Sequence, residues 1–163
     1  MNVGEWLQGS EWIGVVVSPF VGSFAAAASR RYARQEPVVA DRSRCDSCGA
    51  ALRACELVPL ISWAALGGRC VRCGEAIGLR PLLIELAYLA MGVAALLVLN
   101  GSLFWIGCVL GWVLLGLALI DLEAFLLPDV ITFPLIAIGL AVAGISGRGE
   151  FLDHALAAIL GFA

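Results

Sequence analysis

Long apolar runs separated by short polar breaks make up most of the chain outside residues 30–80. The runs cover residues 12–28, 81–99, 103–120 and 130–145 and carry almost no charge. A helix needs roughly 20 apolar residues to cross a bilayer. The first run, with 17 residues from Trp12 to Ala28, is just long enough. The pattern therefore predicts four transmembrane helices.

A fifth apolar segment covers residues 151–163 and is too short to cross a bilayer as a helix. Either it lies on the membrane surface or the sequence continues beyond it. A cleavable signal peptide is disfavoured at the N-terminus, because Glu5 and Glu11 precede the first run and no positive charge does. We predict an all-α polytopic membrane protein with about four to five transmembrane helices.

Residues 30–80 differ in kind, because they are polar and rich in arginine, cysteine, proline and glycine. They predict a small folded loop domain outside the bilayer. Nine of the ten arginines lie here, so the positive-inside rule places this domain in the cytoplasm. We expect three parts: a first transmembrane helix (1–29), a cytoplasmic cysteine-rich zinc domain (30–80) and a transmembrane core (81–163) that is incomplete at its C-terminus.

Composition agrees with a membrane protein, since 61% of the residues are hydrophobic and the mean hydropathy is +0.97. The net charge of −3 adds little. Basic residues form no broad surface outside the loop domain, which argues against nucleic acid as a partner. The lipid bilayer is the first partner that the sequence predicts.

Four cysteines form two similar CxxC pairs, Cys45/Cys48 and Cys70/Cys73, each followed by a glycine. Two intervening residues let both sulfurs face one metal ion, and the glycine permits the tight turn. The 21 residues between the pairs lie at the long edge of the range for a four-cysteine zinc site. Four thiolates form a closed, structural site, so we predict structural zinc.

Two disulfides or a redox pair are the alternatives for these cysteines. A cytoplasmic loop disfavours stable disulfides, and a redox CxxC usually occurs once in a domain. Of the two remaining cysteines, Cys108 is expected to be a small core residue of its helix. Cys55 has no evident role.

Three acids stand between the third and fourth apolar runs, in the stretch IDLEAFLLPD. We expect Asp121 to be partly buried at a helix end, where an acid is a functional candidate. Glu123 is expected on a solvated face, and Asp129 is placed to cap the next helix. Glu85 lies about one turn into the second run, and we expect it to pair with an arginine at the interface.

Together these residues resemble the type 4 prepilin peptidases, the bacterial membrane aspartic peptidases of type IV pili and type II secretion. The resemblance covers nearly the whole chain in the right block order. The blocks are GSF at 22–24, SRCDSC at 43–48, VPLISW at 58–63, GRCVRC at 68–73, RP through EL at 80–86, ID at 120–121 and LPDVITFPL at 127–135.

The resemblance implies cleavage of the leader peptide of type IV prepilins or pseudopilins at the cytoplasmic face of the bacterial plasma (inner) membrane. It implies that Asp121 is one of two catalytic aspartates. It also implies possible N-methylation of the new N-terminus with S-adenosylmethionine, for which the chain shows no glycine-rich nucleotide cradle.

The family's second aspartate belongs to a Gly-x-Gly-Asp block, which this sequence lacks. Two carboxylates must share the chemistry, one neutral and one ionised, so Asp121 alone cannot act. We therefore expect an N-terminal portion of the enzyme that is inactive by itself. The alternatives are a catalytically incomplete, zinc-stabilised membrane module that binds pilin helices or partner subunits, and a membrane redox protein that uses its CxxC pairs.

Overall fold

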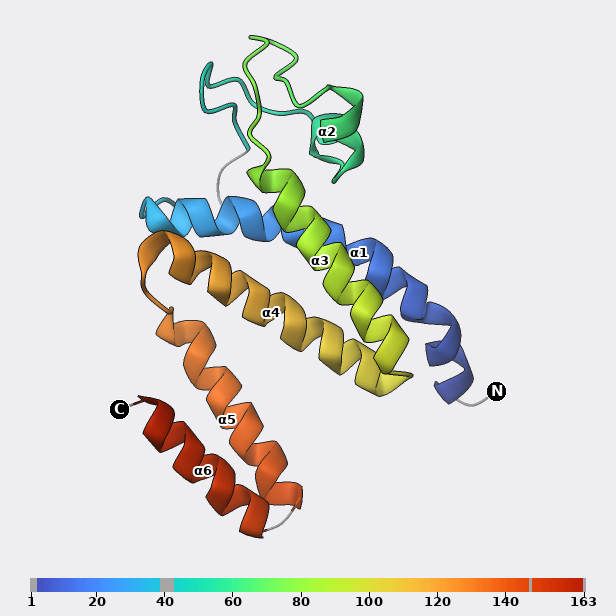
Figure 1. The fold of residues 1–163 in the computed structure, drawn as a ribbon, viewed down its shortest axis with the longest axis vertical. Helices are drawn as coiled ribbons and strands as arrows, with labels where there is room; N and C mark the ends of the chain where they lie inside the picture. The colour runs from blue at the N-terminus through green and yellow to red at the C-terminus, as the bar shows by residue number, and fades with distance from the viewer. Residues whose placement is uncertain (1–2, 39–42, 147, 163) are drawn as a thin grey trace. The chain divides into compact units, whose positions relative to one another are not determined.

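The computed structural model describes residues 3–38, 43–146 and 148–162, and these are mainly helical, with no β-strand beyond two isolated bridges. Two units are compact in themselves, Met1–Phe125 and Leu126–Ala163. The elements (Figure 1) are α1 (Val3–Ala33), the 3-10 helix η1 (Ala54–Leu57), α2 (Ile61–Ala65), α3 (Arg80–Val98), α4 (Ser102–Ala124), α5 (Asp129–Ser146) and α6 (Arg148–Phe162).

Three helices are long and apolar enough to cross a membrane: Gly9–Ala33 within α1, Arg80–Val98 and Ser102–Ala124. The shorter apolar helices are Asp129–Ile145 and Leu152–Gly161. The predicted class of a helical membrane protein is therefore confirmed, with three of the expected spans at full length. The first and third helices run further than their apolar runs, because both continue into polar residues at the end nearest the loop domain.

The first unit is built on α1, which packs against both α3 and α4. Figure 1 shows a bend along α1, and the helix contains Pro19, which cannot donate a backbone hydrogen bond inside a helix. The preceding Ser18 hydroxyl donates to the Gly14 carbonyl at 2.8 Å. Such back-bonding also bends helices.

Glycines allow these helices to approach closely, as small residues do in membrane bundles. A Cβ added at Gly22 of α1 would lie 3.0 Å from the Tyr88 side chain of α3, and one at Gly14 would lie 2.6 Å from Phe104 of α4. A Cβ at Gly92 of α3 would collide with Ser18 of α1. The short backbone distances between the helices therefore require glycine, which has no side chain, at these positions.

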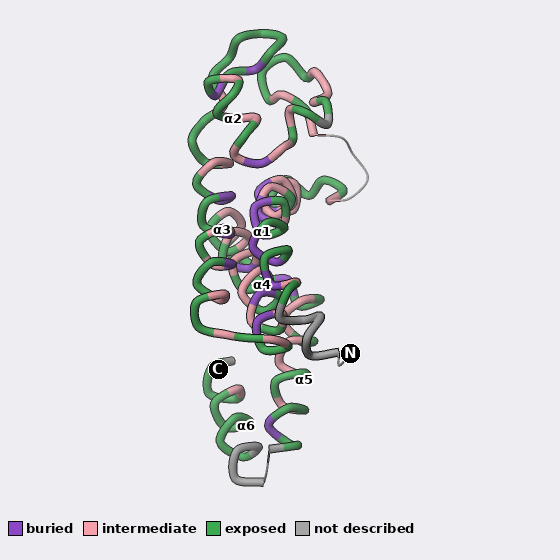
Figure 2. The backbone as a smooth tube through the Cα atoms, turned by 90° about the vertical axis from the view of Figure 1, so that its right-hand side faces the viewer, coloured by how far each residue is buried: buried purple, intermediate pink, exposed green. Residues whose placement is uncertain are grey.

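Two buried clusters lie along α1 and give the bundle its core. One contains Val15, Phe104 and Cys108, which confirms Cys108 as a core residue. The other contains Ala26, Ile84 and Tyr88. Figure 2 shows buried residues along α1 and the helices that face it, while much of the remaining helix surface is exposed. That exposed surface is rich in large apolar side chains, as expected where lipid surrounds a helix.

Several polar groups inside the bundle bond to one another, as a lipid environment favours, whereas the buried Trp105 indole N–H has no hydrogen-bond partner among the described residues. The Trp112 indole N–H donates to Ser18 Oγ at 3.1 Å, and the Tyr88 hydroxyl donates to the Trp112 carbonyl at 3.0 Å. Buried Glu11 accepts from the Gly101 N–H at 2.5 Å, just before α4 begins. These bonds tie α1 to α4 and α3 to α4.

The second unit contains α5 and α6, which pack against each other. Within its first turn, the Thr132 hydroxyl donates to the Pro128 carbonyl at 3.1 Å. Pro134 lies inside α5, in its second turn, where proline cannot donate the backbone hydrogen bond of the helix.

Substitution of Gly92 by alanine is expected to destabilise the first unit, because the new methyl group would push against Ser18 and the α1 backbone. Overpacking of this kind costs about 1–3 kcal/mol. Gly139→Ala in α5 is the matched control, since nothing lies within 4 Å of a Cβ added there. Thermal unfolding in detergent should show a lower midpoint for Gly92→Ala alone. Equal midpoints for the two variants would contradict the close packing.

Candidate functional site

The loop domain contains two knuckles with the same backbone geometry. In the first, the Cys45 N–H donates to the Ala50 carbonyl and the Gly49 N–H to the Cys45 carbonyl, both at 2.9 Å. In the second, Cys70 repeats these bonds with Glu75 and Gly74 at the same distances. Both glycines have positive φ, 68° and 72°, which favours glycine. The sequence repeat therefore produces a structural repeat.

The two knuckles bring their sulfurs together. The Sγ atoms of Cys45, Cys48, Cys70 and Cys73 all lie within 4.8 Å of one another, and this group could hold a metal ion. All six cysteines are free thiols, and the 3.8 Å from Cys45 Sγ to Cys73 Sγ joins the two pairs rather than the members of one pair. Convergence of four donors from two loops is the arrangement of a tetrahedral metal site.

The thiols in this cluster differ in their affinity for protons. Backbone N–H groups of Cys73 and Arg72 lower the pKa of Cys70 to about 7. The Glu75 N–H lowers the pKa of Cys73, but desolvation and the neighbouring sulfurs outweigh it and raise that pKa to about 12. Four thiolates so close together repel one another, and a divalent cation offsets that repulsion. The donor set fits a thiolate-bound metal.

Cys55, the remaining cysteine of the loop domain, lies outside this cluster and is exposed in η1. Elsewhere in the domain, Trp63 of α2 packs against Gly68, where an added Cβ would lie 2.8 Å from the indole ring. That contact places the turn before the second knuckle against α2.

The loop domain is fastened to the bundle at two points. Asp46, inside the first knuckle, forms ion pairs with Arg30 at 3.4 Å and Arg34 at 3.9 Å near the end of α1. Glu85 of α3 is buried and accepts from the Leu60 N–H at 2.8 Å, just before α2. We expected an arginine partner for Glu85, and its partner is instead this backbone group. Leu60 has a positive φ of 62°, and the bond holds it in that conformation.

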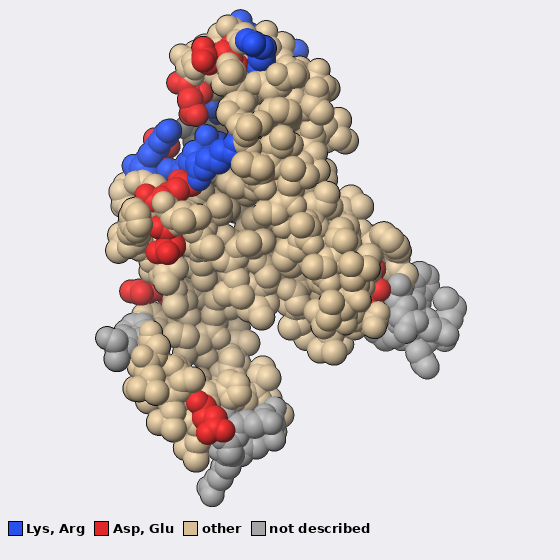
Figure 3. All heavy atoms as spheres, in the orientation of Figure 1, with Lys and Arg blue, Asp and Glu red and all other residues tan. Residues whose placement is uncertain are grey.

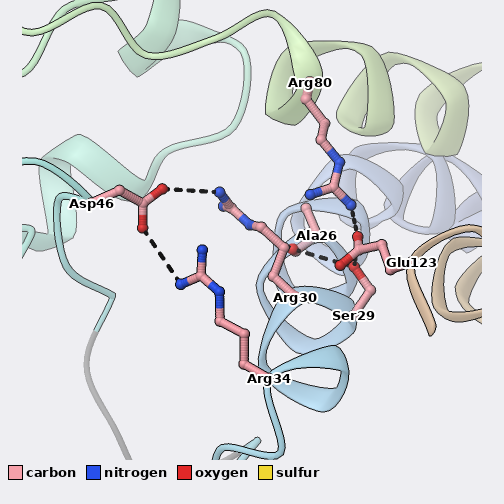
Figure 4. A network of polar contacts seen from close by, with 7 residues as sticks. All are labelled: Ala26, Ser29, Arg30, Arg34, Asp46, Arg80 and Glu123. Atoms are coloured by element: carbon pink, nitrogen blue, oxygen red, sulfur yellow. Dashed lines mark hydrogen bonds and ion pairs between the residues drawn. The ribbon is translucent and has the colours of Figure 1, made fainter.

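Charged side chains gather where the loop domain meets the helices. Figure 3 shows arginines there with acidic side chains beside them, while the helix flanks in that view are largely uncharged. Figure 4 resolves the cluster into Asp46 with Arg30 and Arg34, and Glu123 with Arg80 and Ser29. The exposed Asp46 pairs are individually weak, whereas Glu123 is mostly buried.

Asp121 lies in the last turn of α4, at the same end of the bundle as the loop domain. Its carbonyl accepts from the Phe125 N–H at 2.8 Å, which closes the helix with Phe125 in the left-handed conformation. The expectation of partial burial is wrong, because the Asp121 side chain is exposed. Asp121 lies on a face of α4 turned away from the contacts that Glu123, two residues further on, makes with α1 and α3.

Glu123 differs from the expectation drawn from the sequence. It forms an ion pair with Arg80 of α3 and accepts a hydrogen bond from the Ser29 hydroxyl of α1 at 2.9 Å. The expectation of a solvated face is therefore wrong. One signal was available: Arg80 and Glu123 carry opposite charges at the same predicted membrane face, at the beginning and end of consecutive spans.

Asp129 is the first residue of α5 and is exposed. An acid in the first turn favours a helix electrostatically, because it faces the positive end of the helix dipole. Its assignment as a capping residue stays a prediction.

Two family models match the chain at positions that include these features. The bacterial peptidase A24 N-terminal domain matches residues 16–99, with all four clustered cysteines. The type IV leader peptidase family matches residues 108–163, with Asp121 and Asp129.

The chain belongs to the type IV leader peptidase family.

Curated relatives agree with this membership in the leader peptidase family, and each bears the name prepilin leader peptidase/N-methyltransferase. The protein of Myxococcus xanthus is 36% identical over 87% of this chain and 43% of its own length. The protein of Pseudomonas aeruginosa is 39% identical over 77% of this chain and 43% of its own length. The protein of Dichelobacter nodosus is 42% identical over 62% of this chain and 36% of its own length. This leader peptidase chain thus spans less than half the length of these relatives. No solved structure matches it at a significant level.

Metal analysis tests the cysteine centre of this leader peptidase chain directly. We expect about one metal ion per purified chain, because four thiolates complete one closed tetrahedral site. Cys73→Ser should lose most of the metal, because one thiolate is removed from the set. Cys55→Ser, a thiol outside the cluster, should keep it. Equal metal content in both variants would contradict a metal site at the four cysteines, and metal-free protein with disulfides within the two pairs would favour the redox alternative.

Proposed function

We propose that the complete protein containing this chain is a membrane aspartic endopeptidase that cleaves the leader peptide of type IV prepilins or pseudopilins. The observation that carries the proposal is the match of both family models, which together cover the cysteine domain and Asp121. The names of the relatives supply the reaction class.

In this proposal Asp121 is one of two catalytic carboxylates. An aspartic peptidase uses one ionised carboxylate to take a proton from water and one protonated carboxyl to donate to the scissile carbonyl. The exposure of Asp121 supports this role, because a reacting group must meet both water and substrate.

The charge distribution supports one orientation of the proposed enzyme in the membrane. The arginine-rich loop domain faces the cytoplasm under the positive-inside rule. Asp121 lies at the same end of the first unit and therefore shares that side. The turn before α4, with Gly101, then lies on the outer face of the bacterial plasma (inner) membrane. A substrate with an apolar helix could enter the bilayer alongside and present its leader junction at the cytoplasmic face.

We assign zinc to the four cysteines and give it a structural role. Thiolates prefer zinc among the common cellular metals with tetrahedral geometry, and four of them leave no open position for a substrate. Bound to all four cysteines, zinc would cross-link the two knuckles. Asp46 and Glu85 connect the domain to α1 and α3. The proposed division is a first helix (1–29), a zinc domain (30–80) and a peptidase core (from 81).

The relatives are also named as N-methyltransferases. We extend the proposal to methylation of the new N-terminus with S-adenosylmethionine as donor. The names of the relatives support this extension.

Leader cleavage tests the role of Asp121. In the complete protein, Asp121→Asn should lower cleavage of a prepilin about a thousandfold or more, because the amide cannot take or share a proton. Membrane abundance should be unchanged, since the side chain is exposed. Glu36→Gln, an exposed acid after α1, is the matched control and should cleave normally. Full activity of Asp121→Asn would end the assignment.

Asp129 gives a second test with the opposite expectation. Asp129→Asn should reduce cleavage only modestly, because asparagine also caps helices. The same assay and abundance measurement apply. Complete loss of cleavage with normal abundance would mean that Asp129, rather than Asp121, carries the chemistry.

A further inference from the structure

Glu123 joins three helices two residues after Asp121. Its carboxylate forms an ion pair with Arg80, the first residue of α3, and accepts from the Ser29 hydroxyl of α1 at 2.9 Å (Figure 4). Its side chain is 16% exposed and that of Arg80 is 43% exposed. A partly desolvated pair with an added hydrogen bond is stronger than an exposed surface pair.

The helix dipoles explain why this pair matters. An arginine at the start of α3 faces the positive end of that helix, and a glutamate at the end of α4 faces the negative end. Each charge alone disfavours its own helix end. The two helices are antiparallel neighbours, so each charge offsets the unfavourable field around the other. Loss of either partner therefore leaves an uncompensated charge at a helix terminus.

The last turn of α4 has little else to hold it. Phe125 follows it with a left-handed φ of 51° in a non-glycine residue, and its side chain is 84% exposed. Leu122 is 73% exposed, and Asp121 is also exposed. Helix ends with so few buried contacts open locally at little free-energy cost. Within the described part of the first unit, Glu123 is the residue of this turn that is held by both α1 and α3.

We propose that Glu123, through Arg80 and Ser29, is a positioning residue that fixes the last turn of α4 and thereby the carboxylate of Asp121. This inference rests on the proposed peptidase function for its kinetic consequence. Its structural part stands independently. Displacement of a reacting group by about 1 Å can cost about a hundredfold in rate, so a frayed α4 end lowers turnover without removing the chemistry.

Hydrogen exchange tests the structural part without any activity. In Glu123→Gln, amides of residues 121–125 should exchange at least about tenfold faster, because an uncharged side chain no longer pairs with Arg80. Glu36→Gln should leave their exchange unchanged. Unchanged exchange in Glu123→Gln would overturn the proposal. Ser29→Ala removes one hydrogen bond and should accelerate the same amides less; it serves as the test if Glu123→Gln does not fold.

Kinetics of the complete protein test the consequence for Asp121. Glu123→Gln should lower kcat for leader cleavage about ten- to hundredfold with KM nearly unchanged, as expected when a catalytic group is misplaced. The double variant Arg80→Glu with Glu123→Arg restores an opposite-charge pair and places each charge at its favoured helix end. The Ser29 hydroxyl can accept from the introduced arginine. The double variant should therefore recover most of the lost kcat.

The outcomes separate the two claims. If the wild-type protein fails to cleave, or Asp121→Asn cleaves fully, the proposed function fails while the exchange result still decides the positioning role. If those two behave as expected but Glu123→Gln keeps its kcat, the positioning role is wrong. Loss in Glu123→Gln that the double variant does not restore also overturns it, because the carboxylate would then act without Arg80.

Discussion

The ion pair between Arg80 and Glu123 is the contact on which the loop-domain end of the bundle depends. It joins the beginning of α3 to the end of α4, and Ser29 extends it to α1. At the opposite end of the same three helices, Glu11 of α1 accepts from the Gly101 N–H before α4. Glycines between these ends allow close packing, as at Gly22 against Tyr88. Carboxylates thus bond to neighbouring helices at both ends of the bundle, and close packing at glycines holds its middle. In lipid, where apolar burial drives little association, helices depend on such packing and hydrogen bonds.

This arrangement separates a metal centre from a candidate reaction centre. The loop domain that contains the four-cysteine cluster is connected to the helices at two points. Asp46 pairs with Arg30 and Arg34 near the end of α1, and Glu85 of α3 accepts a hydrogen bond from the Leu60 N–H just before α2. Asp121 lies on a different element, in the last turn of α4. A closed set of four thiolates and an exposed carboxylate on another element fit a structural metal beside acid–base chemistry. The two features share one end of the first unit because both α1 and α4 end there.

Local patterns carried most of what the sequence could predict. Each cysteine pair with its glycine folds through bonds within six residues, so spacing alone predicted the knuckles and their convergence. Apolar run lengths located the spans. The contact between Ser29 and Glu123 joins residues 94 apart, and it depends on how three helices pack, which periodicity does not contain. The same limit explains Glu85, whose partner is a backbone N–H in a strained turn. It also explains Asp121, which lies on an exposed face of α4 while Glu123, two residues further on, contacts α1 and α3.

We propose that Asp121 is one of two carboxylates that divide the acid and base roles in leader cleavage. The most direct measurement is the pH dependence of kcat/KM for a prepilin substrate cleaved by the complete protein. We expect a bell-shaped profile, because one carboxyl must be protonated and its partner ionised in the active form. A rate that rises with pH to a plateau, as a single ionised base gives, would contradict it.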